Sequence, residues 1–181
     1  SLAIESLVNR LLEKQFEVAL TTTTSTGYKL ALEKYGGRVQ FTGLFPLDFL
    51  PFAHLAWGRI RPDLAILMES ELWPEHLYQA RCRRVPILLV NARMSDRSFN
   101  RAKGVTWAYR QILQSLAGLA ASGQLDLERY LELGIPEKQA TCTGNLKLDI
   151  DPGPELTDVA KKTLLEEIGF EENLPVILGS S

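Results

Sequence analysis

The spacing of apolar residues changes along the chain, and the changes predict alternating helices and strands. The first residues carry apolar side chains at three-to-four spacing, which predicts an amphipathic helix with one face built from Ile4, Leu7, Val8, Leu11 and Leu12. The apolar run from Leu64 to Met68 is continuous instead, as in a strand buried on both faces of a parallel sheet.

The remaining segments continue this alternation with short connections. Strands are expected at 16–21, 39–45, 64–68, 86–90, 116–121 and 140–143. Helices are expected up to about residue 35, then at 49–60, 74–84, 98–116 with Gly104 as a candidate break, and 125–133. This order predicts an α/β fold with a doubly wound, Rossmann-like parallel sheet. Such a fold usually begins with a strand, so we expect a first strand upstream of Ser1.

A change of composition near residue 150 predicts a domain boundary. Pro152, Gly153 and Pro154 interrupt the pattern, so residues 149–156 are interpreted as a linker after a domain at 1–148. Residues 157–181 contain a predicted helix and an apolar run that ends in Gly179-Ser180-Ser181. They are interpreted as the beginning of a second nucleotide-binding domain.

Composition and charge describe an ordinary globular protein. The 181 residues are 45% hydrophobic and 23% charged, with a formal net charge of −2, which gives no indication of bulk nucleic-acid binding. Cys82 and Cys142 fit no metal or disulfide spacing and are expected to be small buried residues. His54 and His76 make no metal motif, so a structural or surface role is expected for each.

The end of the Leu64–Met68 run carries the first candidate site. Ligands of open parallel sheets bind outside the carboxyl ends of the strands, where Glu69, Glu71 and Trp73 follow this run. If the extended geometry persists to Glu71, the two glutamates face one cleft. Alternatively, both only favour the dipole of a helix that begins at Pro74.

Two other strand ends carry polar groups. The loop from Thr22 to Gly27, which includes Thr24, can hold a phosphate or sugar through hydroxyls and amides, or it only caps a helix. After the strand at 86–90, Asn91 and Arg93 occupy ligand-facing positions, and Arg93 has the geometry to clamp an anionic group. Ser95 either contacts the ligand or caps the next helix.

Basic residues outnumber acidic ones locally between residues 79 and 114. Asp96 is the one acidic residue there, against Arg81, Arg83, Arg84, Arg93, Arg97, Arg101, Lys103 and Arg110. A solvated helix face and an anionic partner, such as a phosphorylated lipid or a membrane surface, both remain open.

Taken together, six segments resemble the N-terminal domain of the 3-deoxy-D-manno-octulosonic acid (Kdo) transferases. They occur in that family's order and cover most of the chain. The segments are Thr21–Tyr28, Pro46–Asp48, Arg61–Asp63, Glu69–Pro74, Val90–Ser95 with Ser98, and Thr143–Lys147.

The resemblance implies the N-terminal half of a two-domain GT-B glycosyltransferase. Such an enzyme transfers Kdo from CMP-Kdo, its donor substrate, to a lipid A precursor at the cytoplasmic face of the bacterial inner membrane, without a metal or other cofactor. Membrane contact is expected through the basic surface and an N-terminal anchor that this chain lacks. The family's proposed general base precedes the first helix, upstream of Ser1, and Glu5 does not match it.

By the same resemblance, residues from several strand ends form the acceptor-side cleft, while the donor site belongs mainly to the second domain. The acceptor-side residues are Thr24, Gly27, Glu69, Glu71, Trp73, Asn91, Arg93 and Ser98. Gly179 and Ser180 lie at the donor-side edge. No catalytic residue or metal ligand is assigned.

Two alternatives remain open from the sequence. Fold alone does not choose a substrate, so a GT-B glycosyltransferase of other specificity fits as well. A non-catalytic α/β module that binds an anionic ligand through the glutamates and Arg93 is the second alternative. Because the base and most of the donor domain lie outside it, the 181-residue chain by itself is predicted to be inactive.

Overall fold

The computed structural model describes residues 4–148, 157–167 and 169. The chain divides into two compact units, Ser1–Ile150 and Asp151–Ser181, which are treated separately below. The predicted linker at 149–156 and the run that ends at Gly179 and Ser180 lie outside the described residues.

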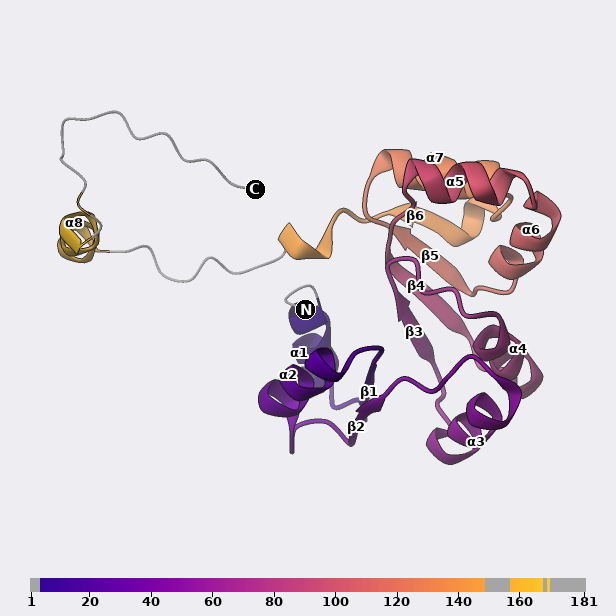
Figure 1. The fold of residues 1–181 in the computed structure, drawn as a ribbon, viewed down its shortest axis with the longest axis horizontal. Coiled ribbons are helices and arrows are strands. Elements are labelled where there is room, and N and C mark those ends of the chain that lie inside the picture. Colours follow the sequence, from indigo (N-terminus) through magenta and orange to yellow (C-terminus); the bar gives the residue numbers. More distant parts are fainter. Residues whose placement is uncertain (1–3, 149–156, 168, 170–181) are drawn as a thin grey trace. The chain divides into compact units, whose positions relative to one another are not determined.

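Helices and strands alternate in the first unit as the apolar spacing predicts (Figure 1). The elements are α1 (Glu5–Glu13), β1 (Ala19–Thr22), α2 (Ser25–Tyr35), β2 (Phe41–Leu44), α3 (Leu50–Ile60), β3 (Ala65–Met68), α4 (Pro74–Arg83), β4 (Ile87–Ala92), α5 (Asp96–Lys103), α6 (Thr106–Gln114), β5 (Gly118–Ala121), α7 (Gln124–Glu132) and β6 (Ala140–Cys142). Short 3-10 helices lie before β6 at Glu137–Gln139 and after it at Leu146–Leu148, and the second unit contains α8 (Asp158–Glu167). The helix break predicted at Gly104 separates α5 from α6.

All strand pairs are parallel, which confirms the predicted fold class. Among the described residues, β1 pairs with β2, and β3 to β6 form a second sheet in the order β3-β4-β5-β6. Several strands begin later than the apolar pattern predicts; β1, for example, begins at Ala19 rather than Phe16. Phe16 is exposed in the turn after α1 and adds nothing to the ladder.

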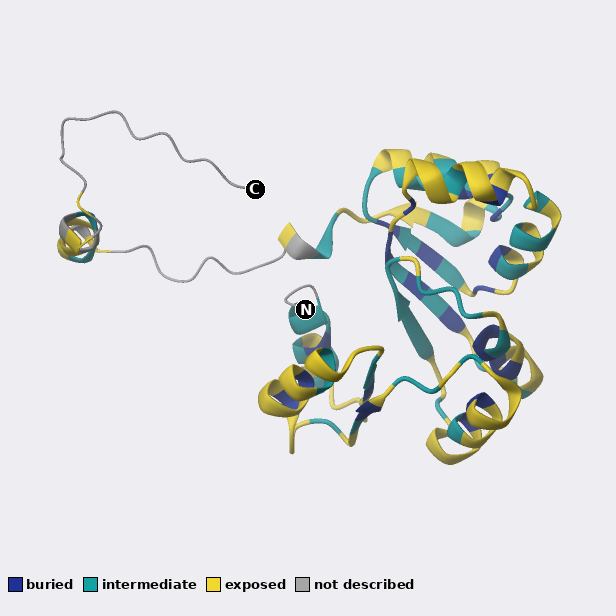
Figure 2. Cartoon of the chain, viewed as in Figure 1, coloured by how far each residue is buried: buried dark blue, intermediate teal, exposed yellow. Residues whose placement is uncertain are grey.

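The main core lies between the four-stranded sheet and its helices (Figure 2). Leu89 of β4 and Ala121 of β5 are fully buried, as are Leu113 of α6 and Tyr130 of α7. A smaller cluster holds the two-stranded sheet to its helices through Val8, Leu20, Ala31 and Tyr35. The α1 face predicted from the sequence contributes Val8 to this cluster, with Ile4 and Leu12 packed against it.

The loop after β2 connects the two-stranded sheet to α3 and α4. The Asp48 carboxylate accepts hydrogen bonds from the Glu75 and His76 amides at 2.9 and 3.2 Å, in the first turn of α4. The buried His76 ring accepts at Nδ1 from Trp57 Nε1 and lies 3.1 Å from the Pro46 carbonyl at Nε2. The indole is always a donor, so this arrangement requires a neutral ring that donates from Nε2. His76 is therefore structural, as expected for it.

The expectation that both cysteines are buried is wrong. Cys82 and Cys142 are exposed. The face of α4 that packs inward carries His76, Leu77, Gln79 and Ala80, which leaves Cys82 on the opposite face. Cys142 lies in β6, the last strand in the described order, where one edge of the sheet is open.

Replacing Asp48 with alanine is expected to lower the free energy of unfolding by about 1–2 kcal/mol, because two helix-start amides lose their acceptor. Asp48→Asn keeps an acceptor oxygen and is the matched control, with a much smaller expected loss. Urea denaturation of the three proteins measures the difference. Equal losses in both variants would show that the negative charge matters and the cap does not.

Candidate functional site

A cavity of about 530 Å³, named the carboxyl-edge cavity here, opens beside the ends of β1 and β3. One wall consists of β1, the following loop and α2, and includes Thr22, Thr24 and Gly27. The opposite wall consists of β3 and the turn after it, and includes Glu69 and Glu71. Phe45, Trp73, Lys34 and Tyr35 also line it. The cavity thus lies at the edge where parallel sheets bind ligands.

The Thr22–Gly27 loop caps α2 and requires glycine at its end. The Thr24 hydroxyl accepts a 3.0 Å hydrogen bond from the Gly27 amide. A Cβ atom at Gly27 would lie 2.9 Å from Thr24 Oγ1 and 3.4 Å from Thr22 Cβ, so a larger residue would displace the cap. The loop therefore presents a helix N-terminus, which favours negative charge, to the cavity.

The extended geometry considered for the segment up to Glu71 is not what the structure shows. β3 ends at Met68, Glu69 has a φ of 59°, and the Glu71 amide bonds back to the Met68 carbonyl at 3.1 Å. Neighbours hold this turn in place, because the Glu69 amide donates to Val90 O at 3.0 Å and the Arg93 amide donates to Glu69 O at 3.3 Å. Both glutamates line the cavity, but through a tight turn. A left-handed backbone at a non-glycine residue is uncommon and is concentrated at functional sites.

Glu71 and Trp73 act as a pair in the cavity wall. Trp73 Nε1 donates a 2.7 Å hydrogen bond to Glu71 Oε2. The Trp73 ring also contacts Phe45, with centroids 6.0 Å apart and planes tilted by 36°. The carboxylate of Glu71 is thereby fixed on an aromatic wall with its second oxygen available for a further donor, such as a substrate hydroxyl.

Three of the residues predicted for the acceptor-side cleft do not line this cavity. Asn91 and Arg93 follow β4, and Ser98 lies in the first turn of α5. Asn91 is 1% exposed with a φ of 50°, and its Oδ1 accepts from the Leu146 amide at 3.2 Å. Arg93 is exposed and donates from Nε to Ser122 Oγ at 3.2 Å. The structure thus groups Thr24, Gly27, Glu69, Glu71 and Trp73 and leaves these three further along the same edge.

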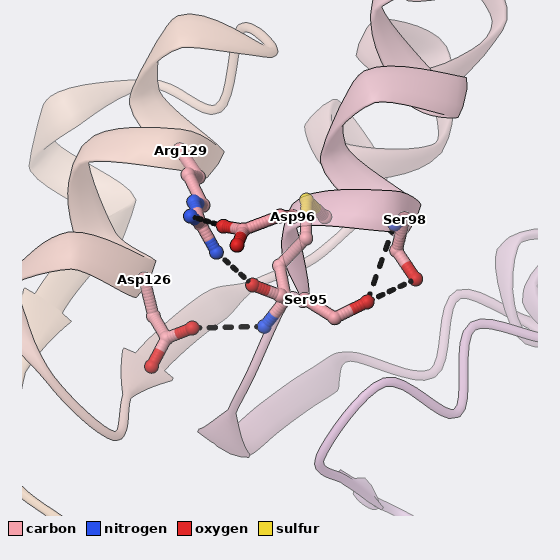
Figure 3. A network of polar contacts seen from close by, with 6 residues as sticks. Ser95, Asp96, Ser98, Asp126 and Arg129 are labelled. Atoms are coloured by element: carbon pink, nitrogen blue, oxygen red, sulfur yellow. Dashed lines mark hydrogen bonds and ion pairs between the residues drawn. The ribbon is translucent and has the colours of Figure 1, made fainter.

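Helix α7 holds the segment between β4 and α5 (Figure 3). The Met94 amide donates to Asp126 Oδ1 at 2.8 Å, and Arg129 bonds to both the Met94 carbonyl and the Asp96 carboxylate. Ser95 caps α5 by accepting from the Ser98 amide at 3.2 Å, which confirms the capping alternative for Ser95. This strand end is therefore fixed by protein contacts.

Tyr130 of α7 also holds the segment between β4 and α5 in place. Its hydroxyl donates to the Arg93 carbonyl at 3.1 Å, and its ring is fully buried. Burial, with smaller contributions from Tyr109 and Asp126, raises the pKa of the Tyr130 hydroxyl well above its ordinary value of 10.0. The neutral hydroxyl is thus the form that the fold requires.

The basic residues between positions 79 and 114 lie at both the amino and the carboxyl ends of the strands in the four-stranded sheet. Arg81, Arg83 and Arg84 lie at the C-terminal end of α4, before β4 begins, where cations favour the helix dipole. Arg93 and Arg97 lie beyond the carboxyl end of β4, and Lys103 pairs with Glu132 at 3.0 Å. The local excess is therefore not confined to the edge that holds the cavity.

Sequence patterns did not point to Phe45 in the cavity wall. They also did not point to the α7 side chains that bind the segment after β4, which are Asp126, Arg129 and Tyr130. Phe45 follows β2 as Glu69 follows β3, so its position directly after a strand was a signal that could have pointed to it.

Over the residues that the structure describes, no group of three His, Cys, Asp or Glu side chains is placed to hold a metal ion. No helix in that part of the chain is long and apolar enough to cross a membrane.

Fold and cavity together define a class, a Rossmann-like α/β domain of the GT-B type. A crystal structure of UDP-GlcNAc 2-epimerase from Neisseria meningitidis bound to UDP-GlcNAc superposes with a TM-score of 0.58 over 95% of this chain and 51% of that one. At 12% identity this likeness shows the fold alone. The family model for 3-deoxy-D-manno-octulosonic-acid transferase (kdotransferase) matches residues 1–150, and the chain belongs to that family.

Curated relatives agree with this family. The 3-deoxy-D-manno-octulosonic acid transferase of Haemophilus influenzae is 34% identical over 140 residues, which are 77% of this chain and 32% of that protein. The transferase of the same name from Bordetella pertussis is 35% identical over 153 residues, 82% of this chain and 35% of that protein. The chain thus spans about a third of the length of these relatives.

The raised pKa of Tyr130 predicts a stability loss in alkali. The folded protein keeps the proton more tightly than the unfolded chain, so this contribution is present below pH 10 and declines as the pH rises beyond it. Tyr130→Phe is expected to flatten the decline above pH 10 and to cost about 1 kcal/mol at pH 8, where the bond to Arg93 is lost. Urea titrations of the wild-type protein and the variant from pH 8 to pH 11 test both expectations. If stability falls equally with pH in the two proteins, Tyr130 does not cause the loss in alkali.

Proposed function

We propose that the full-length protein transfers Kdo from CMP-Kdo to a lipid A precursor in lipopolysaccharide assembly. Membership of the Kdo transferase family over residues 1–150 carries this proposal. The carboxyl-edge cavity supports it, because it combines carboxylates, hydroxyls and an aromatic wall, which suit a sugar.

The reaction is a displacement at the anomeric carbon of Kdo. An acceptor hydroxyl attacks that carbon and gives its proton to a base, the new glycosidic bond forms, and the bond to the phosphate oxygen breaks as CMP leaves. The enzyme must position the hydroxyl and hold the base close to it. The proposal needs no metal or other cofactor, as the family resemblance implies.

Glu71 and Glu69 are proposed to orient the acceptor sugar. The 2.7 Å bond from Trp73 fixes one oxygen of Glu71, and a sugar hydroxyl then donates to the other. Glu69 lies in the same wall, two residues earlier. The base itself is proposed to come from the segment upstream of α1, so neither glutamate receives that role. Arg93 and Ser98, further along the edge, are proposed to meet the acceptor's phosphates.

Exposed apolar side chains support a lipid-bearing acceptor at a membrane surface. Four large apolar side chains in the loop before α3 and in its first turn are 50–68% exposed. They are Leu47, Phe49, Leu50 and Phe52. The same loop begins at Phe45 in the cavity wall, so the apolar group is continuous in sequence with the proposed acceptor site. Exposed apolar side chains that lie close together on a protein surface are typical of contacts with lipids or with other proteins. We propose that they face the cytoplasmic leaflet of the inner membrane.

Incubating the full-length enzyme with CMP-Kdo and a tetra-acylated lipid A precursor tests the proposal directly. Mass spectrometry is expected to show addition of one or more Kdo units. The purified 181-residue chain, assayed in parallel, is expected to add none, since the proposed base and most of the donor domain lie outside it. Absence of transfer by the full-length enzyme would refute the function; transfer by the short chain would refute the assignment of the base.

In the full-length enzyme, Glu71→Gln and Glu69→Gln are each expected to lower kcat/KM by roughly ten- to hundred-fold, the effect of losing a charged hydrogen bond of about 1.5–3 kcal/mol. Glu137→Gln, an exposed site outside the cavity, is the matched control and should leave the rate unchanged. Thermal unfolding of each variant separates catalysis from stability. Wild-type rates in both cavity variants would exclude them from the acceptor site.

A further inference from the structure

An exposed arginine beyond the end of β4 is held at three points by its neighbours. The Arg93 amide donates to the Glu69 carbonyl at 3.3 Å, and the Arg93 carbonyl accepts from the Tyr130 hydroxyl at 3.1 Å. The side chain donates from Nε to Ser122 Oγ at 3.2 Å. An exposed arginine normally keeps much of its rotamer freedom. Arg93 is both exposed and restrained, unlike an ordinary surface arginine.

Asp126 of α7 determines how Ser122 bonds to Arg93. An ionised carboxylate only accepts hydrogen bonds, and a serine hydroxyl has one hydrogen to donate. Ser122 Oγ donates that hydrogen to Asp126 Oδ2 at 2.8 Å, so its lone pairs remain to accept from Arg93 Nε. The direction of both hydrogen bonds therefore follows from the carboxylate of Asp126.

Both oxygens of Asp126 bond to groups outside its own helix. Oδ1 accepts from the amide of Met94, the residue after Arg93, at 2.8 Å (Figure 3), while Oδ2 accepts from Ser122. An acidic residue that only favoured the dipole of α7 would need neither partner. Asp126 thus holds the backbone beside Arg93 and, through Ser122, the Arg93 side chain.

The bond at Nε leaves the far end of the Arg93 guanidinium for another partner. Nη1 and Nη2 make no hydrogen bond to the residues that the structure describes. Because the guanidinium is planar, fixing Nε restricts the plane in which these two nitrogens donate. Together they form the end of the fork that binds a phosphate or a carboxylate through two parallel hydrogen bonds.

We propose that Asp126 is a positioning residue that acts through Ser122 to orient Arg93, so that Nη1 and Nη2 meet a phosphate of the acceptor. This inference rests on the proposed function, in which Arg93 meets that phosphate. In this role neither Asp126 nor Ser122 touches the acceptor. A guanidinium that is oriented before binding loses less freedom when the phosphate arrives, so the pair strengthens acceptor binding.

Nuclear magnetic resonance of the full-length protein tests the orientation without catalysis. The Nε–Hε signal of Arg93, identified by its loss in Arg93→Lys, is expected to have an order parameter near that of rigid backbone, about 0.85. Ser122→Ala leaves the bonds of Met94 and Tyr130 in place and is expected to lower it below about 0.6. Asp126→Asn keeps an oxygen for the Met94 amide but turns a donor toward Ser122, so the value is expected to fall there too.

A double-mutant cycle in the full-length enzyme tests whether Ser122 acts through Arg93. Ser122→Ala is expected to raise the KM for the lipid A precursor by about three- to ten-fold, with kcat and the KM for CMP-Kdo little changed. In an Arg93→Ala background the same change is expected to have no further effect. Ser115→Ala, which removes an exposed hydroxyl bonded to the Ile112 carbonyl, is the matched control and should leave the KM unchanged.

Three results would overturn the inference. One is the same order parameter for Arg93 Nε in the wild type and in both variants. Another is an equal rise in KM from Ser122→Ala with and without Arg93, and the third is a rise in the KM for CMP-Kdo alone. A full-length enzyme that transfers no Kdo refutes the proposed function instead, and the order parameters then still decide whether Asp126 and Ser122 orient Arg93.

Discussion

The contact between the Phe45–Asp48 loop and α4 determines the relative placement of the two sheets. No described strand pairs β1 with β3, so side-chain contacts must hold the walls of the carboxyl-edge cavity in place. Asp48 provides two hydrogen bonds to the start of α4, and the neutral His76 ring bridges Trp57 and the loop backbone. Phe45 then packs against both His76 and Trp73. The wall that carries Glu71 is thus positioned by contacts made far from it in the sequence.

Local patterns were enough to predict the order of elements and the edge that carries the site. Helical spacing identified α1, and continuous apolar runs identified β3 and β4, as is typical of strands in a parallel sheet. The expectation that the Leu64–Met68 run is buried on both faces is met less fully, because all four residues of β3 are half-buried. The rule that ligands bind at the carboxyl ends of parallel strands led to Thr24, Gly27, Glu69, Glu71 and Trp73, which line one cavity. Whether they bind an acceptor sugar remains a prediction.

Features that depend on long-range contacts could not be predicted in this way. The turn at Glu69 is held by hydrogen bonds to Val90 and from Arg93, so its left-handed backbone has no signal in the local sequence. The exposure of Cys82 likewise depends on which face of α4 packs against the core. The residue type alone does not tell which face that is. The hydrogen bond from Trp73 Nε1 to Glu71 Oε2 lies beyond the end of β3, and no local pattern pointed to it.

The reach of Asp48 across 27 residues has a consequence for synthesis on the ribosome. The N-terminal half emerges first, with a small cluster of four buried residues to hold it, while the helix that fixes its position has yet to be made. The larger cluster, built around β4, β5 and their helices, is complete only after α7. The smaller cluster is therefore synthesised first, and the contacts that attach it to the larger cluster form only after α4 has been made.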